Sequence, residues 1–172
     1  MKFKNTVIYT CHIDSPLGGI TMAATDQGLA GVWFDQQRHW PDTTGWQTRA
    51  DHPALVEAAA QLRDYFAGRR DHFDLKLDLS HGTPFQQSVW QALLAIPPGE
   101  TTSYGALSAG VGNPAAVRAV GAAVGRNPIS VIMPCHRVLG SDGSLTGYAG
   151  GLDRKQALLQ LEGALQAQPE IA

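Results

Sequence analysis

The sequence lacks several features that mark specialised classes of protein. Its two cysteines, Cys11 and Cys135, cannot form a disulfide framework, which favours a reducing, cytoplasmic location over secretion. No apolar run reaches the ~18 residues of a membrane span and no charged-then-apolar leader opens the chain, so we expect no membrane contact. Hydrophobic residues make up 44% and charged residues 16%, which indicates a globular chain rather than a disordered one.

The chain also has no excess of positive charge. Thirteen basic and fifteen acidic residues give a net charge of -2, which argues against binding to nucleic acid through bulk charge. Between residues 101 and 141, however, Arg118, Arg126 and Arg137 occur without an acidic residue. Such a patch can meet phosphates locally, although a solvated surface that happens to lack acids explains it equally well.

The first 80 residues predict a small antiparallel sheet and one helix. Apolar runs bounded by turn residues predict strands at residues 7–12, 20–24, 29–34 and 75–79. Residues 36–51 are expected to form a loop. Residues 53–67 carry apolar side chains at helical spacing, and Gly68 follows where a left-handed cap ends a helix.

The composition changes near residue 81, where we place a domain boundary between residues 1–81 and 82–172. Thr83 followed by Pro84 is a helix start, because threonine caps the free amide groups and proline fits the first turn. The apolar face of this helix continues until a Pro-Pro-Gly sequence ends it. Beyond the boundary the chain is mostly helical.

Two short helices, at residues 103–109 and 114–125, are joined by a glycine turn, with Asn113 capping the second. This is the outline of a helix-turn-helix, although many helical proteins contain such a corner. The second helix carries mainly alanine, glycine and valine, and Arg118 is its one charged residue. Tight packing against a neighbouring helix explains the small residues, and so does entry into a groove of DNA with Arg118 projecting.

The reactive groups of the chain gather after residue 128. A strand-like apolar run over residues 129–133 ends at Pro134, and Cys135 and His136 follow directly. A nearby base or positive charge lowers the pKa of a thiol from about 8.5 and so makes it reactive. Adjacent side chains on an extended chain point to opposite sides, so the pair needs a bend or a bridging water. Taken alone, the pair is more typical of a structural cysteine beside an incidental histidine.

The string Pro134-Cys135-His136-Arg137-Val138 resembles the signature of the O6-alkylguanine-DNA alkyltransferases, the methylated-DNA–protein-cysteine methyltransferases. The resemblance is strong over residues 84–163 and loose before residue 80. Further matches in the family's order and spacing are Tyr104 with Leu107, Gly112-Asn113-Pro114, Arg118-Ala119-Val120-Gly121, Asn127-Pro128, Gly147-Tyr148, Gly150-Gly151, Lys155 and Glu162-Gly163.

The resemblance implies an α/β (α+β) fold. The N-terminal domain is expected to be ribonuclease H-like with an antiparallel sheet, and the C-terminal domain mostly helical and winged-helix-like, with the helix-turn-helix. The implied function is DNA repair by irreversible, stoichiometric transfer of an alkyl group from O6-alkylguanine to Cys135, with O4-alkylthymine as a second candidate substrate. The implied partner is double-stranded DNA, bound through its minor groove with the damaged base flipped out. We expect a monomer in solution that uses no cofactor.

The resemblance also implies catalytic roles. Cys135 is the alkyl acceptor and needs an exposed, ionisable sulfur. His136 acts on it as a base through a water, and Glu162 orients the imidazole. Tyr104 hydrogen-bonds the target guanine and helps to protonate it as it leaves, while Asn127 holds the bend between recognition helix and active site. No route for hydrolysing the resulting thioether is evident, so each molecule acts once.

The remaining implied roles concern DNA and the pocket. Rotating a nucleotide out of the duplex costs a few kcal/mol, and Arg118 is expected to fill the gap that it leaves. The other recognition-helix positions are Ala116, Val117, Ala119 and Gly121, with Val117 where the family commonly has a smaller alanine. Backbone groups at Val138 and Ala149 read the guanine edges, and Tyr148 and Pro128 shape the pocket.

No metal site is expected. His81 matches one zinc ligand of some relatives, but no cysteine accompanies it, and Cys11 is interpreted as a strand residue. Two other classes stay open. A non-catalytic lesion binder of the same fold lacks the acceptor cysteine, so the presence of Cys135 argues against it. A thiol hydrolase using Cys135 and His136 needs an oxyanion hole and multiple turnover.

Overall fold

The computed structural model describes residue 3 and residues 6–165 of the chain, so the outer ends of the two expected domains lie outside the described residues. The strands are β1 (Tyr9–Ile13), β2 (Ile20–Thr25), β3 (Gly28–Phe34), β4 (Gln47–Thr48), β5 (Thr102–Ser103) and β6 (Val138–Leu139). The helices are α1 (Pro53–Phe66), α2 (Pro84–Leu94), α3 (Tyr104–Gly110), α4 (Val117–Gly125) and α5 (Leu152–Leu161), with one 3-10 turn, η1 (Cys135–Arg137). Among the described residues, no helix has the length and apolar character needed to cross a membrane.

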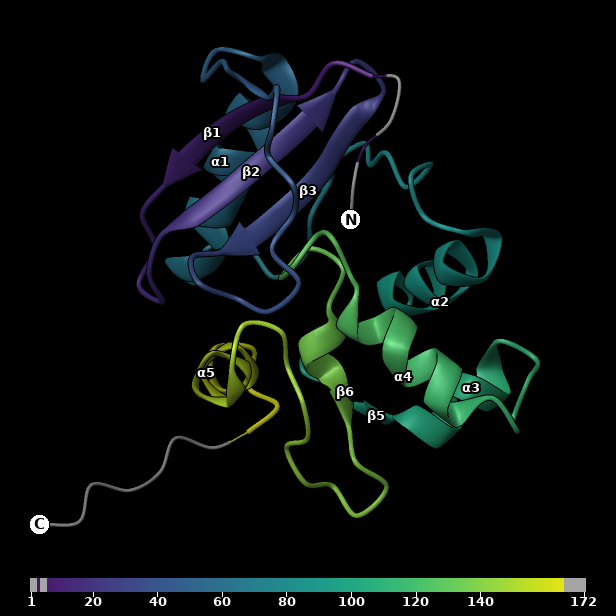
Figure 1. Ribbon diagram of the computed structural model, residues 1–172. Helices are drawn as coiled ribbons and strands as arrows, with labels where there is room; N and C mark the ends of the chain where they lie inside the picture. Colours follow the sequence, from purple (N-terminus) through teal and green to yellow (C-terminus); the bar gives the residue numbers. More distant parts are fainter. Residues whose placement is uncertain (1–2, 4–5, 166–172) are drawn as a thin grey trace, which may run out of the picture.

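The N-terminal sheet has the strand order β3-β2-β1-β4 (Figure 1). Three of the four expected strands form an antiparallel meander, with Ile13 opposite Ile20 and Ile20 opposite Phe34. β4 lies within the expected loop and pairs parallel to β1, a contact between distant segments that a local pattern does not predict. α1 packs on one face of the sheet, as Figure 1 shows. This domain is the expected ribonuclease H-like α/β unit.

One predicted strand is wrong. Residues 75–79 make an isolated bridge, in which Leu77 lies beside Leu29. The chain then turns away, because the Asp78 carboxylate accepts hydrogen bonds from Thr25 Oγ1 at 2.6 Å and from Ser80 N at 3.0 Å. The alternation therefore does not mark a ladder of strand pairs, since Leu75, Leu77 and Leu79 are half-buried and the polar Asp78 is itself buried.

The two halves of the molecule share one apolar core. Leu55 and Leu62 of α1 belong to the same cluster of buried side chains as Trp90 of α2 and Leu158 of α5. A second, smaller cluster around Trp33 covers the other face of the sheet. Because side chains from both halves fill one core, the position of each half is fixed by the other.

The C-terminal half confirms the expected helix-turn-helix, formed by α3 and α4 packed beside α2 (Figure 1). α2 begins as predicted, since Thr83 Oγ1 accepts from Gln86 N at 3.1 Å and Gln86 Oε1 accepts from Thr83 N at 3.0 Å. α4, in contrast, starts at Val117, three residues later than predicted. Asn113 lies in the preceding turn, where its carbonyl accepts from Ala116 N at 3.0 Å, and it does not cap the helix.

Both interpretations of the small residues in α4 apply, each to a different face of the helix. Val120, Ala123 and Val124 are buried, and the indole of Trp90 donates to the Ala123 carbonyl at 2.9 Å. The opposite face is open, and Arg118 lies on it. Small side chains therefore let α2 approach closely and leave a shallow exposed surface.

Candidate active site

The apolar run before the cysteine is a turn rather than the expected strand. Ile129 makes one bridge to β3, and Ile132 N then donates to the Ser130 carbonyl at 2.9 Å. Val131, between them, has a φ of 72°, a left-handed conformation that is strained for a β-branched residue. The chain folds back here because tertiary contacts outweigh the strand preference of the run.

Asn127 closes this turn from inside. Its Oδ1 accepts from Ile129 N at 2.9 Å and its Nδ2 donates to the Met133 carbonyl at 2.7 Å. The same carbonyl accepts from Cys135 N at 2.8 Å. The structure thus places Asn127 between the end of α4 and the cysteine.

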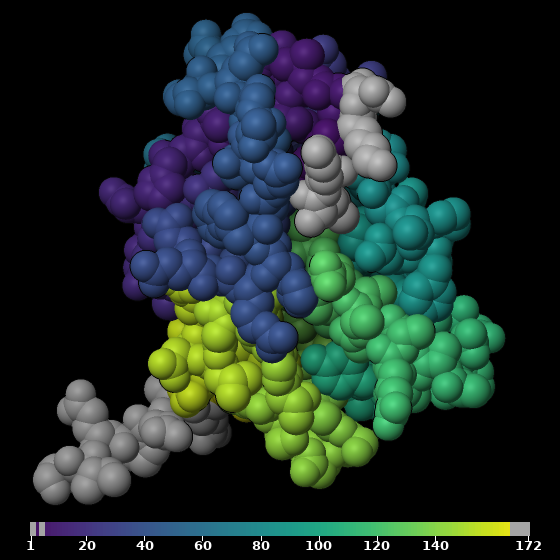
Figure 2. Space-filling model, in the orientation of Figure 1, coloured from purple at the N-terminus to yellow at the C-terminus, as the bar shows by residue number. Residues whose placement is uncertain are grey.

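Cys135 lies at a pocket of about 320 Å3. Four further residues predicted for the site line it: Tyr104, Gly121, Tyr148 and Ala149. Arg38 and His39, from the loop after β3, also line the pocket and were not predicted. Arg38 N donates to the Ala149 carbonyl at 2.9 Å, and Figure 2 shows this loop lying against the C-terminal segments. No local pattern marks these residues, because a contact between distant segments brings them to the pocket.

The sulfur is not exposed, contrary to our expectation. Cys135 has an exposed fraction of 6%, and burial raises the pKa of its thiol to about 11. A hydrogen bond with Asn127 and the charge of Lys155 act in the opposite direction and lower this pKa. At neutral pH the resting thiol therefore keeps its proton, and ionisation requires a base.

Lys155 of α5 is a buried cation behind the pocket. Its Nζ donates to the carbonyls of Val138 at 2.6 Å, Thr146 at 2.8 Å and Gly147 at 3.2 Å. Burial lowers its pKa to about 8, which leaves it mainly charged at neutral pH. Lys155 matches the family, but no role was predicted for it, because its position in the sequence does not show that its charge acts on Cys135.

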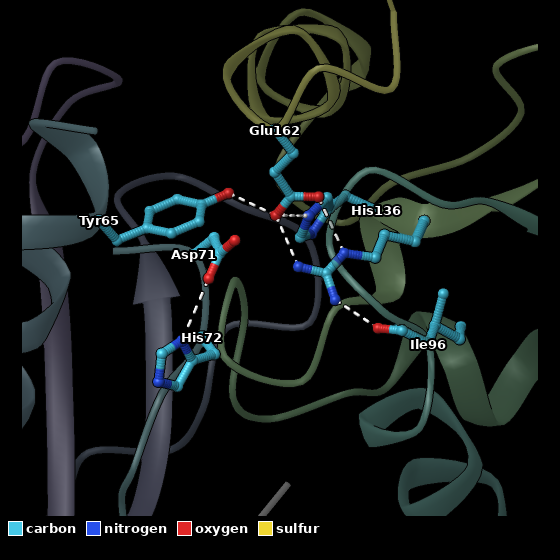
Figure 3. A network of polar contacts seen from close by, with 7 residues as sticks. Tyr65, Asp71, His72, Ile96, His136 and Glu162 are labelled. Carbon is cyan, nitrogen blue, oxygen red and sulfur yellow. Dashed lines mark hydrogen bonds and ion pairs between the residues drawn. The ribbon is translucent and has the colours of Figure 1, made fainter. Parts of the chain in front are cut away.

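The two residues that follow Cys135 belong to a polar network centred on Glu162 (Figure 3). Glu162 Oε2 lies 2.9 Å from His136 Nε2 and accepts from Arg137 at 2.8 Å. Arg137 Nε donates to the other carboxylate oxygen at 2.8 Å, so the pairing is bidentate. Tyr65 Oη, from α1, donates to Oε2 at 2.6 Å. The structure brings together His136 and Glu162 as predicted and adds Tyr65, which sequence analysis missed.

The charges of this network follow from its contacts. Arg137 and His136 hold the pKa of Glu162 at about 2, although burial opposes this. A carboxylate accepts hydrogen bonds, so His136 Nε2 carries a proton. Burial lowers the pKa of His136, which leaves the imidazole neutral and Nδ1 unprotonated. Nδ1 is buried and makes no hydrogen bond to any described residue, so it is available as a base.

The remaining predicted residues lie outside the pocket. Arg118 and Ala119 are exposed on α4, as is Val117 with an exposed fraction of 39%, and Ala116 precedes the helix.

Two predicted pocket residues, Pro128 and Val138, are buried and are not among the described residues that line the pocket. Their carbonyls are engaged elsewhere: that of Pro128 accepts from Val32 N, and that of Val138 accepts from Lys155 Nζ.

The fold and the site together define a class. A ribonuclease H-like domain packs on a helix-turn-helix domain that holds a cysteine at a pocket, and the next residue is a buried histidine that contacts a buried glutamate. Family models of 6-O-methylguanine DNA methyltransferase match residues 7–79, as its ribonuclease-like domain, and residues 84–164, as its DNA binding domain. The chain therefore belongs to the 6-O-methylguanine DNA methyltransferase family.

Individual relatives agree over most of the chain. A methylated-DNA–protein-cysteine methyltransferase of Mycobacterium tuberculosis is 51% identical over 156 residues, which cover 91% of this chain and 93% of the relative. That of Methanosarcina acetivorans is 48% identical over 160 residues, covering 91% and 99%. The crystal structure of Mycobacterium tuberculosis OGT in complex with DNA has a TM-score of 0.82 at 49% identity, covering 91% and 92% of the two chains.

Proposed function

We propose that this chain repairs DNA by transferring the alkyl group of O6-alkylguanine to its own Cys135, once per molecule. The observation that carries the proposal is a thiol at a pocket, backed by a buried neutral histidine whose second nitrogen is held by an ionised glutamate. The family of the chain supports the same chemistry. The acceptor cysteine argues against a binder without activity.

The reaction begins with proton removal. His136 Nδ1 takes the thiol proton through a bridging water, and Glu162 stabilises the imidazolium that forms. Asn127 and Lys155 stabilise the thiolate, since both lower the pKa of Cys135. The sulfur then attacks the alkyl carbon in line, a C–S bond forms, and the bond between that carbon and guanine O6 breaks.

The leaving guanine takes up a proton from Tyr104 as the bond between the alkyl carbon and guanine O6 breaks. Tyr104 lines the pocket, and burial raises the pKa of its phenol, so it stays protonated until the leaving group needs the proton. The pocket walls at Tyr148 and Ala149 hold the base. Restoring the thiol requires a nucleophile to displace the Cys135 thiolate from an unactivated alkyl carbon. Water does this only very slowly, so the modified protein does not turn over.

Access to the lesion requires the nucleotide to leave the duplex. The exposed face of α4 enters the minor groove, and Arg118 fills the vacated position in the stack. The small side chains at Ala116, Ala119 and Gly121 allow a close approach, and Val117 adds bulk at one point. We also propose that the boundary between the two domains lies near residue 81. The protein is proposed to act as a monomer in the cytoplasm.

Intact-mass measurement after incubation with duplex DNA containing O6-methylguanine tests this function. We expect one methyl group to replace the thiol hydrogen, at a 1:1 limit, and Cys135→Ser to abolish the change. Lesion binding without a change in mass would instead indicate a non-catalytic binder. Multiple turnover of an ester or amide would indicate a thiol hydrolase.

A further inference from the structure

The carboxylate of Glu162 receives one donor from a distant part of the chain. Two of its partners, His136 and Arg137, follow Cys135 directly, whereas Tyr65 belongs to the last turn of α1 in the N-terminal domain (Figure 3). At 2.6 Å, the phenol bond is the shortest of the bonds to this carboxylate.

From this contact we infer that Tyr65 is a positioning residue, which fixes Glu162 and through it the imidazole of His136 for proton removal from Cys135. The inference rests on the proposed function and gives the N-terminal domain a direct part in it. Tyr65 is not among the described residues that line the pocket, and its hydroxyl donates to Glu162, so we take Glu162 as the residue through which it acts.

The phenol is held rigidly enough for this role. Tyr65 has an exposed fraction of 1%, and its ring packs against Phe66 and Phe73 at centroid distances of 5.4 and 5.3 Å. Burial and the adjacent Glu162 raise its pKa, so the hydroxyl stays a donor. The side chain of Glu162 is 1% exposed, and bulk water therefore does not readily replace a lost donor there.

The Tyr65 hydroxyl and His136 Nε2 both contact the same oxygen of Glu162, Oε2, so the two groups compete for its negative charge. The charged groups that face His136 are Glu162, Arg137 and Lys155, of which only Glu162 favours the imidazolium. Each donor to Oε2 weakens the pull of the carboxylate on the imidazole. The hydroxyl of Tyr65 therefore helps to keep His136 neutral and ready to accept a proton, in addition to holding Glu162 in place.

Single-turnover kinetics of Tyr65→Phe on O6-methylguanine duplex test the inference, because this substitution removes one oxygen and keeps the ring. We expect the rate constant to fall about tenfold, as for loss of one hydrogen bond to a charged group. Lesion-duplex affinity, measured in a Cys135→Ser background, should stay unchanged. Tyr9→Phe is the matched control, because Tyr9 stacks on His52 at the opposite end of α1.

Two further readouts separate positioning from a general loss of structure. Without the hydroxyl, Glu162 attracts the imidazolium more strongly, so the pKa of His136 rises and the low-pH limb of the rate profile moves to higher pH. In a Glu162→Gln background, Tyr65→Phe should cause no further loss of rate, because the residue through which it acts is already changed.

The inference fails if folded Tyr65→Phe, checked by its thermal unfolding, transfers the methyl group at the wild-type rate with an unshifted pH profile. Additive losses in the double variant would also overturn it. If the wild-type protein itself transfers no methyl group, the proposed function has failed instead, and the two outcomes are distinguishable.

Discussion

Burial acts on Cys135 and Glu162 in the same direction, and their partners decide the outcome. Desolvation raises the pKa of both groups. Glu162 receives a bidentate arginine, an imidazole and a phenol, which together hold its pKa at about 2. At Cys135, a hydrogen bond with Asn127, the charge of Lys155 and a backbone hydrogen bond oppose burial too weakly, and the pKa is raised to about 11. At neutral pH the site therefore holds an ionised Glu162 beside His136 and a protonated thiol at Cys135.

At this scale we predict a loss of stability at acid pH. The pKa of Glu162 is lowered from 4.5 to about 2 in the folded protein, so its contribution is complete above pH 4.5 and lost as the pH falls towards 2. Urea unfolding at several pH values measures it. Glu162→Gln should lose less stability over this range than the wild type, whereas exposed Glu100→Gln should follow the wild type. Parallel curves for Glu162→Gln and wild type would contradict the assignment.

At the scale of elements, local and distant interactions set helix boundaries differently. The start of α2 is predictable because the reciprocal hydrogen bonds between Thr83 and Gln86 lie within four residues. The start of α4 is not, because a separate turn comes first: the Asn113 carbonyl accepts from Ser108 Oγ of α3 and from Ala116 N, and the helix begins only at Val117. The turn between α3 and α4 thereby orients the exposed face of α4.

The exposed arginine of α4 supports a prediction about substrate form. Arg118→Ala should slow repair of a lesion duplex at least tenfold, but reaction with free O6-methylguanine base by less than twofold, on the order expected when a flipped state loses a few kcal/mol of support. Transfer rates on the two substrates measure this. Arg63→Ala, an exposed arginine on α1, is the control for charge. Equal losses on duplex and free base would remove Arg118 from this role.

At the scale of the whole molecule, the two domains are tied together around the site. Arg154 of α5 donates to the carbonyl of Leu17 at 2.9 Å and to those of Asp35 and Gly150 at 3.2 Å. Its guanidinium lies 4.8 Å from the centroid of the Phe34 ring. Together with the shared core, these contacts hold the N-terminal sheet against the loop that carries Tyr148 and Ala149.

We predict that Arg154→Leu lowers the free energy of unfolding by about 1–3 kcal/mol, because partly buried carbonyls lose their donor. Arg63→Leu, on the exposed side of α1, should change it by about 0.5 kcal/mol or less. Urea denaturation followed by tryptophan fluorescence gives both values. A single transition is expected for each variant, since both domains contribute to one core. An Arg154→Leu variant as stable as the wild type would show that the Arg154 contacts do not contribute to the free energy of unfolding.

Much of this protein is encoded locally in its sequence. Three strands, α1, α2 and the helix-turn-helix follow from turn residues, caps and apolar spacing, because neighbouring residues determine those patterns. The adjacent thiol and imidazole, with the family signature around them, indicate the chemistry from the sequence alone. Tertiary structure decided what depends on distant segments: the turn at Val131, the loop of Arg38 at the pocket, and the burial of Cys135. It also decided the contact between Tyr65 and Glu162, since two residues 97 positions apart meet only when both domains fold onto one core.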